Sequence, residues 1–250
     1  MTSISFTKNI LLLICFIGGV SFTGNHKDTT QFEKNKVLIF SKTNGYRHQS
    51  IEVGIAAIKK LGAENNFDVD ATEDSLYLTD ANFKKYKTII FLSTTGTILG
   101  KDQELALQQF IHNGGGLVGI HAATDCEYQW DWYVKMIGGN FLSHPQQQEA
   151  KLIIVDNTHP STKHLPATWQ RKDEWYNFKN LNPDVTVLIK IDETSYTGGK
   201  NGDNHPMAWY HSFEGGKIFY TELGHTNESY SDPLFLQHVL GGIQYTMGVK

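Results

Sequence analysis

The chain has 250 residues, of which 40% are hydrophobic and 12% aromatic, enough to bury a sizeable core in a single domain. Its 26 acidic and 22 basic side chains give a formal net charge of -4, and no stretch of the sequence is basic. Nucleic-acid binding depends largely on lysine and arginine side chains that displace counterions, so this composition excludes nucleic acid as a partner.

The first residues have the pattern of a secretory signal peptide. Lys8 precedes an uncharged apolar run over residues 10–20, which is shorter than a membrane-spanning helix requires. We therefore expect a signal peptide over residues 1–24, a linker over 25–35 and one domain over 36–250. The mature protein is predicted to be exported to the periplasm, without a membrane span.

The chain contains two cysteines, Cys15 and Cys126. A lipid anchor on Cys15 is the alternative to a cleaved signal peptide, but bulky residues precede this cysteine where small ones are preferred. After removal of the signal peptide only Cys126 is left, so an intrachain disulfide is excluded.

Residues 36–121 alternate between predicted strands and helices. The strands are nearly continuous apolar runs, which is typical of parallel strands covered by helices on both faces. The pattern predicts a doubly wound, three-layer α/β fold with a parallel sheet. Strands are expected over 36–43, 67–72, 87–94 and 116–121, and helices over 49–61, 80–86 and 101–113.

The pattern changes in the C-terminal half, where strands follow one another with few helices between them. The sequence "FEGGK" at 213–217 is a hairpin signal, so an antiparallel portion is added to the parallel sheet. Strands are expected over 151–157, 185–191, 206–213 and 217–223, and a final helix over 232–247.

Two loops after predicted parallel strands carry candidate functional residues. Ligands of open parallel sheets bind outside the carboxyl ends of the strands. Arg47 and His48 lie there just before a helix, whose N-terminus favours an oxygen-rich ligand. His121 ends the fourth strand, and the small residues Ala122 and Ala123 after it permit a sharp turn close to a ligand. The alternative interpretations are a solvated loop for the first segment and a structural histidine for the second.

Aromatic and polar residues in the later segments form a second group of candidates. Aromatic rings beside polar groups suit the faces of sugars; the alternative is the core of a helix, which suits Trp132 better than Trp130. His159 and His164 have the sequence contexts of surface histidines, and His238 that of a structural one. The candidates for substrate binding are Trp130, His144, Tyr176, His205, Trp209 and His225, with Glu174 beside them.

Several spaced motifs between Lys36 and Gly248 together resemble the ThuA-like, trehalose-utilisation family. They are "GGGLVGIHAATD", "MIGGNFLSHP", "DEWYNF", "DNHPMAWYH" and "LGHT". The resemblance implies a fold similar to class I glutamine amidotransferases and flavodoxin. In that superfamily the turn carries a nucleophilic cysteine, but here it carries His121. Cys126 lies five residues later, so a glutaminase mechanism is not expected.

The resemblance further implies a role in the use of trehalose and related disaccharides, in pathways that pass through 3-keto sugars made by partner oxidoreductases. The first hypothesis is an enzyme that acts on such a sugar by isomerisation, elimination or hydrolysis. His121 would be the base, and Glu174 the proton donor or orienting carboxylate.

Two further hypotheses stay open. One is a metal-dependent hydrolase with zinc held by a set drawn from His121, His144, His205 and His225, although no compact metal motif is present. The other is a sugar-binding protein without catalytic activity.

Overall fold

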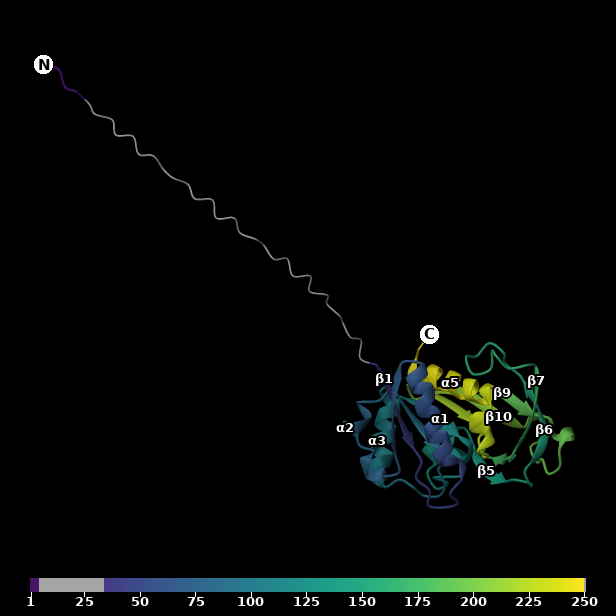
Figure 1. Ribbon diagram of the computed structural model, residues 1–250. Coiled ribbons are helices and arrows are strands. Elements are labelled where there is room, and N and C mark those ends of the chain that lie inside the picture. Colours follow the sequence, from purple (N-terminus) through teal and green to yellow (C-terminus); the bar gives the residue numbers. More distant parts are fainter. Residues whose placement is uncertain (5–33, 250) are drawn as a thin grey trace. The chain divides into compact units, whose positions relative to one another are not determined.

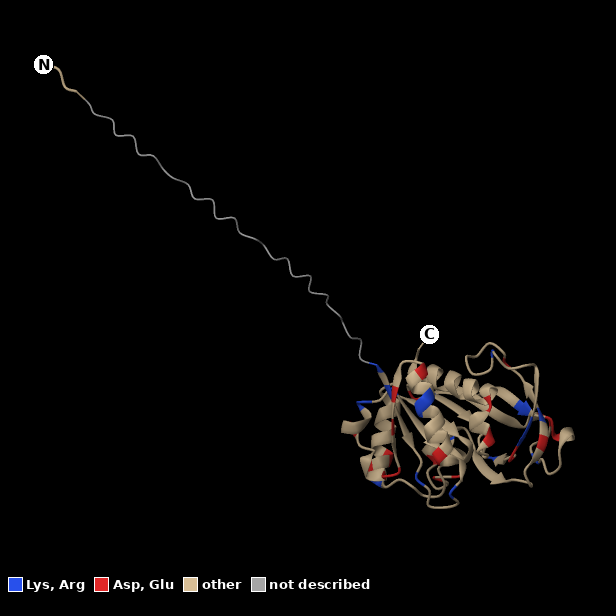
Figure 2. Ribbon diagram, viewed as in Figure 1, with Lys and Arg blue, Asp and Glu red and all other residues tan. Residues whose placement is uncertain are grey.

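The computed structural model describes residues 1–4 and 34–249. Residues 5–24 of the predicted signal peptide, Cys15 among them, lie outside the described residues. Among those described, none of the helices is both long and apolar enough to span a membrane. Acidic and basic residues are interspersed along the folded part of the chain (Figure 2).

The centre of the fold is a nine-stranded sheet in the order β2-β1-β3-β4-β11-β10-β9-β6-β7 (Figure 1). The first five strands in this order pair in parallel. Their apolar side chains are almost all buried, as expected for strands covered on both faces. These strands are β1 (Asn35–Phe40), β2 (Phe67–Thr72), β3 (Thr88–Leu92), β4 (Gly116–Ile120) and β11 (Gly216–Thr221).

The other four strands extend the sheet antiparallel from β11. The predicted mixed architecture, a parallel sheet with an antiparallel portion in the C-terminal half, is thereby confirmed. A separate two-stranded sheet pairs β5 (Asn140–Ser143) with β8 (Asn177–Lys179). The antiparallel strands are β10 (Pro206–Phe213), β9 (Thr186–Ile191), β6 (Gln148–Ile154) and β7 (Thr168–Asp173).

Helices cover both faces of the sheet, which gives three layers. Successive side chains of a strand point to opposite faces. The helices are α1 (Ser50–Glu64), α2 (Asp80–Phe83), α3 (Lys101–His112), α4 (Asp131–Ile137) and α5 (Pro233–Met247). Phe219 of β11 points to α5 and packs so closely on Gly242 that a Cβ at that position would lie 2.3 Å from its ring. The next residue, Tyr220, points to the opposite face, where it lies with Ile137 of α4 beside Gly119 of β4.

The carboxyl ends of β1, β4 and β11 lie at one edge of the sheet, because these strands are parallel. Their following loops carry His48, His121 and His225 to that edge. The segment between β7 and β8 brings Glu174 to the same place, so the antiparallel portion completes a site that the parallel strands begin.

Candidate functional site

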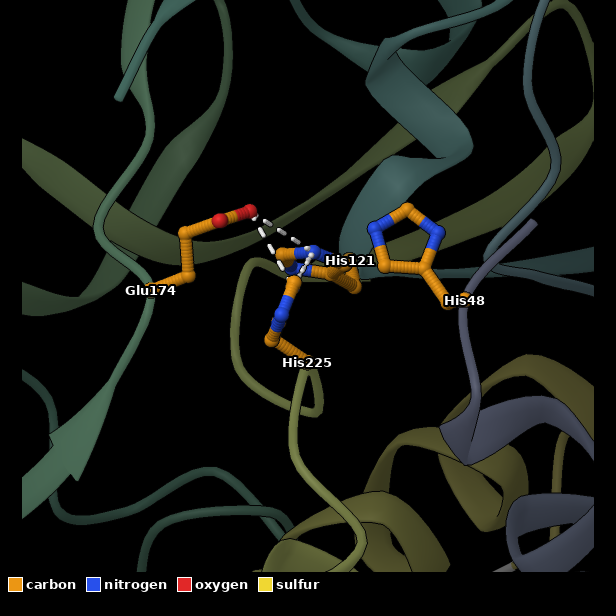
Figure 3. A group of neighbouring side chains, drawn as sticks. All are labelled: His48, His121, Glu174 and His225. Carbon is orange, nitrogen blue, oxygen red and sulfur yellow. Dashed lines mark hydrogen bonds and ion pairs between the residues drawn. The ribbon is translucent and has the colours of Figure 1, made fainter. Parts of the chain in front are cut away.

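Three histidines and one carboxylate from four separate segments converge at this edge. One potential ligand atom from each of His48, His121, Glu174 and His225 lies within 4.8 Å of the others. Figure 3 shows the four side chains pointing toward one another from different parts of the chain. We refer to these four residues as the histidine cluster.

His121 is fully buried and is held in one orientation. Its backbone φ of 51° is left-handed, a conformation that histidine adopts more readily than most side chains and that turns the chain sharply after β4. Its Nδ1 lies 2.8 Å from the backbone carbonyl oxygen of Glu222. A carbonyl only accepts hydrogen bonds, so Nδ1 carries the proton and Nε2 presents its lone pair to the cluster.

Glu174 and His225 face this lone pair. The Nε2 of His121 lies 3.0 Å from His225 Nδ1 and 3.5 Å from Glu174 Oε2. His225 Nδ1 is in turn 3.1 Å from the same carboxylate oxygen. Burial alone would raise the pKa of Glu174, but the neighbouring imidazoles of His121 and His225 hold it well below its ordinary value. Glu174 is therefore ionised at neutral pH.

His48 completes the cluster from the other side. Its ring makes edge-on contacts with His121 and His225, at centroid distances of 4.7 and 5.0 Å. Burial, reinforced by the neighbouring histidines, lowers the pKa of His48 to about 2, so its imidazole is neutral. Its Nδ1 is buried without a hydrogen-bond partner.

His144 contacts the cluster through the second oxygen of Glu174. Its Nδ1 lies 3.1 Å from Glu174 Oε1 and 2.9 Å from the carbonyl oxygen of Pro145. Both partners are acceptors, so Nδ1 carries the proton and Nε2 a lone pair. Its side chain is 44% exposed, which leaves Nε2 free to contact a bound molecule.

A pocket of about 470 Å³ opens above the cluster. Asp125 contributes a second carboxyl to the wall of this pocket, and Tyr128 donates a hydrogen bond of 2.5 Å to it. Burial raises the pKa of Asp125, against the opposing effect of that hydrogen bond. The lining residues are Tyr46, His48, Asp125, Phe141, His144, Gln147, Glu174, Tyr176 and His225.

A larger cavity of about 700 Å³ lies elsewhere, beside α4 and β10. Its one histidine, His211, already uses Nε2 in a 2.7 Å contact with the carbonyl oxygen of Met136. The smaller pocket is the better candidate for chemistry because three histidines and two carboxyl groups line it.

Of the other predicted substrate-binding residues, Tyr176 lies at the pocket, with its ring centroid 4.5 Å from that of His121. His205 is not brought there, since Nδ1 pairs with Glu193 at 2.7 Å and Nε2 lies 2.7 Å from the carbonyl oxygen of Tyr176. Trp209 is fully buried in the core, where its indole donates to the carbonyl oxygen of Ile137.

Two further residues that were predicted to bind substrate, Arg47 and Trp130, are partly exposed and do not line the pocket. Arg47 forms ion pairs with Glu52 and Glu73. Trp130 stacks on Trp132 with ring centroids 5.1 Å apart. These contacts explain both side chains without a ligand.

The sequence did not point to Phe141 or Gln147 as pocket residues, and no local pattern marks them. The expectation that His159 is a surface histidine was wrong. His159 is 6% exposed and stacks on Tyr210 at a centroid distance of 4.5 Å, because its loop is packed under α5.

Comparisons with known proteins agree with the fold. Residues 36–246 match the family model ThuA, described as trehalose utilisation. A crystal structure of a ThuA-like protein from Bacteroides uniformis ATCC 8492 has a TM-score of 0.74 at 26% sequence identity, and the match covers 89% of this chain and 95% of that one. A ThuA-like protein from Parabacteroides merdae ATCC 43184 has a TM-score of 0.73 at 22% identity, covering 87% and 91% of the two chains.

A more distant likeness, at 13% identity and a TM-score of 0.57, is to a beta-galactosidase from Bacillus circulans sp. alkalophilus, and it covers 87% of this chain but 31% of that one. At this identity the likeness concerns the fold alone. No curated protein sequence matches the chain.

Proposed function

The chain belongs to the ThuA family, described as trehalose utilisation, and from this premise we propose that it is an enzyme acting on a disaccharide or its 3-keto derivative. The observation that carries the proposal is the convergence of His121, His225 and Glu174 beneath a pocket at the carboxyl edge of the sheet. Buried titratable groups with displaced pKa values, gathered beside a pocket, are typical of catalytic sites.

The contacts favour particular roles within the cluster. Glu174 is ionised, so it acts as an orienting and charge-stabilising carboxylate rather than as the proton donor. His121 lies beneath the pocket and does not line it. We therefore do not assign His121 the role of the base that removes the substrate proton. It holds His225 and Glu174 in position and contributes to the electrostatics of the site.

Proton transfer falls to two side chains on the pocket wall, His144 and Asp125. The exposed Nε2 of His144 has a lone pair and serves as a base, and the raised pKa of Asp125 suits a proton donor. A keto group acidifies the neighbouring C–H bond, and removal of that proton leads to isomerisation or to elimination of a glycosidic oxygen. The negative charge that develops on the keto oxygen would face the histidine cluster.

A glutaminase activity is not proposed. His121 occupies the turn where amidotransferases have their cysteine, and Cys126 is fully buried. Burial raises the pKa of the Cys126 thiol to about 12, so the thiolate that such a mechanism needs is absent at neutral pH.

The proposed site of action is the periplasm, reached through the signal peptide predicted over residues 1–24. The mass of the protein recovered from periplasmic extract tests this part. A mature chain that begins near residue 25 is the expected result, and an intact Met1 in the cytoplasmic fraction would contradict it.

The enzyme function is tested by incubating the protein with trehalose, other disaccharides and their 3-keto forms, with mass spectrometry of the products. We expect a mass change or a released monosaccharide from at least one keto form, and loss of that product in His144→Ala. Sugar binding without a product from any of these compounds would contradict the proposal and would favour a binding protein.

A further inference from the structure

Three atoms of the histidine cluster are spaced as the ligands of one metal ion. The atoms are His121 Nε2, His225 Nδ1 and Glu174 Oε2, and the distances between them are 3.0, 3.1 and 3.5 Å. Zinc lies about 2.0–2.2 Å from nitrogen and oxygen ligands, which puts the ligands of a tetrahedral site about 3.3–3.6 Å apart, close to the spacing of these three atoms. The fourth side chain, His48, has a ligand atom within 4.8 Å of each of these three.

The lone pairs of these atoms face one another and require a positive charge between them. The Nε2 of His121 is an acceptor because its Nδ1 donates to the carbonyl of Glu222, and Glu174 turns a carboxyl oxygen, a usual metal ligand, toward it at 3.5 Å. A proton on His225 Nδ1 lies within reach of both. It leaves unexplained why the buried ring of His48, which is 4% exposed, also turns a ligand atom to within 4.8 Å of the other three. A metal ion accounts for all four side chains.

The surroundings of the cluster have the features of a second layer around a metal. Metal-binding histidines usually donate their other ring N–H to a carbonyl or carboxylate, as His121 does to Glu222. Ligating carboxylates are themselves hydrogen-bonded, as Glu174 is to His144. These contacts fix the direction of the ligand atoms before an ion arrives.

We propose that His48, His121, Glu174 and His225 bind one divalent transition-metal ion of the zinc class. Three imidazoles and a carboxylate suit zinc, manganese, cobalt or nickel, whereas magnesium and calcium prefer oxygen ligands alone. His48, Glu174 and His225 also line the pocket, so the ion has one side open to a substrate. Bound there, it polarises a sugar carbonyl or a water molecule.

This ligand set differs from the one expected from the sequence. His121 and His225 stay in it, whereas His144 contacts a ligand instead of the ion and His205 has both ring nitrogens engaged elsewhere. His48 and Glu174 take their places. The inference deepens the proposed function, because it names a cofactor for the same pocket.

Metal binding is measured on the full chain, stripped with chelator and titrated with zinc or cobalt at fixed free concentration. We expect one ion per chain in the wild type and in His164→Gln, a partly buried histidine outside the cluster. His144→Ala is expected to retain one ion per chain. In His225→Ala and in the isosteric Glu174→Gln we expect binding at least about 100-fold weaker.

Circular dichroism and thermal melting of each stripped variant show whether it is folded, and Glu174→Gln serves if His225→Ala is not. Failure of the wild type to bind zinc, manganese, cobalt or nickel at micromolar concentration would overturn the inference. Equal binding in Glu174→Gln and the wild type would overturn it as well.

Metal binding and turnover are scored separately, so that the two proposals fail differently. One bound ion without any sugar product contradicts the enzyme function and leaves the metal site standing. Failure to bind any of the metals, together with full turnover in chelator, contradicts the metal site and leaves the enzyme function standing.

Discussion

Two groups of buried histidines in this molecule have the same side chain and different surroundings. In the histidine cluster the ring nitrogens of His121 and His225 are 3.0 Å apart and share a carboxylate. Around α5, His159 and His238 point instead to Ser161, through its hydroxyl and its carbonyl oxygen respectively. Neither ring of the second group lines the pocket above the histidine cluster.

The difference teaches that burial of a histidine does not identify a functional site. His121 and His238 are both 0% exposed. What separates them is convergence. Several potential ligand atoms meet at one point in the first group, whereas each ring of the second group contacts Ser161 through Nδ1 and its buried Nε2 has no hydrogen-bond partner among the described residues. We therefore expect loss of function from changes in the cluster and loss of stability from changes around α5.

The largest difference is expected between His121→Asn and His238→Gln. Asparagine tolerates the left-handed backbone at position 121, so the fold is retained while turnover of the keto sugar falls about 100-fold to 1000-fold, because the electrostatic contribution of His121 to the site is lost. His238→Gln lowers the free energy of unfolding by about 2–3 kcal/mol, with kcat unchanged. Steady-state kinetics and denaturant unfolding check both. Equal losses of turnover in the two variants would break the comparison.

The α5 group makes the fold sensitive to acid. Burial lowers the pKa of His159 to about 4 and that of His238 to about 3, below the value near 6.5 of an unfolded chain. The unfolded chain therefore binds more protons, so stability is full above about pH 6.5 and decreases as the pH falls toward 4 and 3.

At about 1.4 kcal/mol per pKa unit, we expect a loss of about 3 kcal/mol for His159 and about 5 kcal/mol for His238 over that interval. Urea unfolding at a series of pH values measures it. In the double variant His159→Gln/His238→Gln the pH dependence is expected to become shallower, and an unchanged slope would count against this account.

A smaller effect is expected at His144, which contacts the cluster without belonging to it. His144→Ala removes the hydrogen bond to Glu174 Oε1, which is 3.1 Å long. We expect zinc affinity to fall about 10-fold to 100-fold, as is usual for residues that orient a ligand. Competition with a chromophoric chelator measures the affinity. A loss as large as that of His225→Ala would place His144 among the ligands.

No effect on turnover is expected from Cys126→Ala. The thiol is fully buried, with Tyr133 Oη 3.2 Å and Thr94 Oγ1 3.3 Å from its sulfur. We expect native protein to resist alkylation by iodoacetamide and the variant to retain the turnover of the wild type. Inactivation by the reagent at a rate matching modification of Cys126 would restore a thiol mechanism.

The sequence predicted most of the fold because its central strands are uninterrupted apolar runs. The strand expected over 206–213 coincides with β10. β7 was not predicted, since "TWQRKD" is largely polar. Its Arg171 and Asp173 form a buried ion pair of 2.9 Å at the edge of the sheet, and no pattern of apolar residues signals such a strand.

The candidate site was predicted in its residue types and only partly in its members. His121 ends a predicted parallel strand, so the position of the strand end was enough to find it, whereas His225 was singled out by its local sequence in the C-terminal half. Glu174 reaches the site from the unpredicted strand β7, and His205 is drawn away by Glu193. These placements depend on packing of the antiparallel portion, which sequence spacing does not encode.

The central claim is that one group of buried histidines is built around a single metal position. A crystal structure of the protein soaked in zinc, with data collected at the zinc absorption edge, tests it most directly. The account predicts one anomalous peak, about 2.0–2.2 Å from ligand atoms of His48, His121, Glu174 and His225. A peak at His144 or His205, or no peak within the cluster, would contradict it.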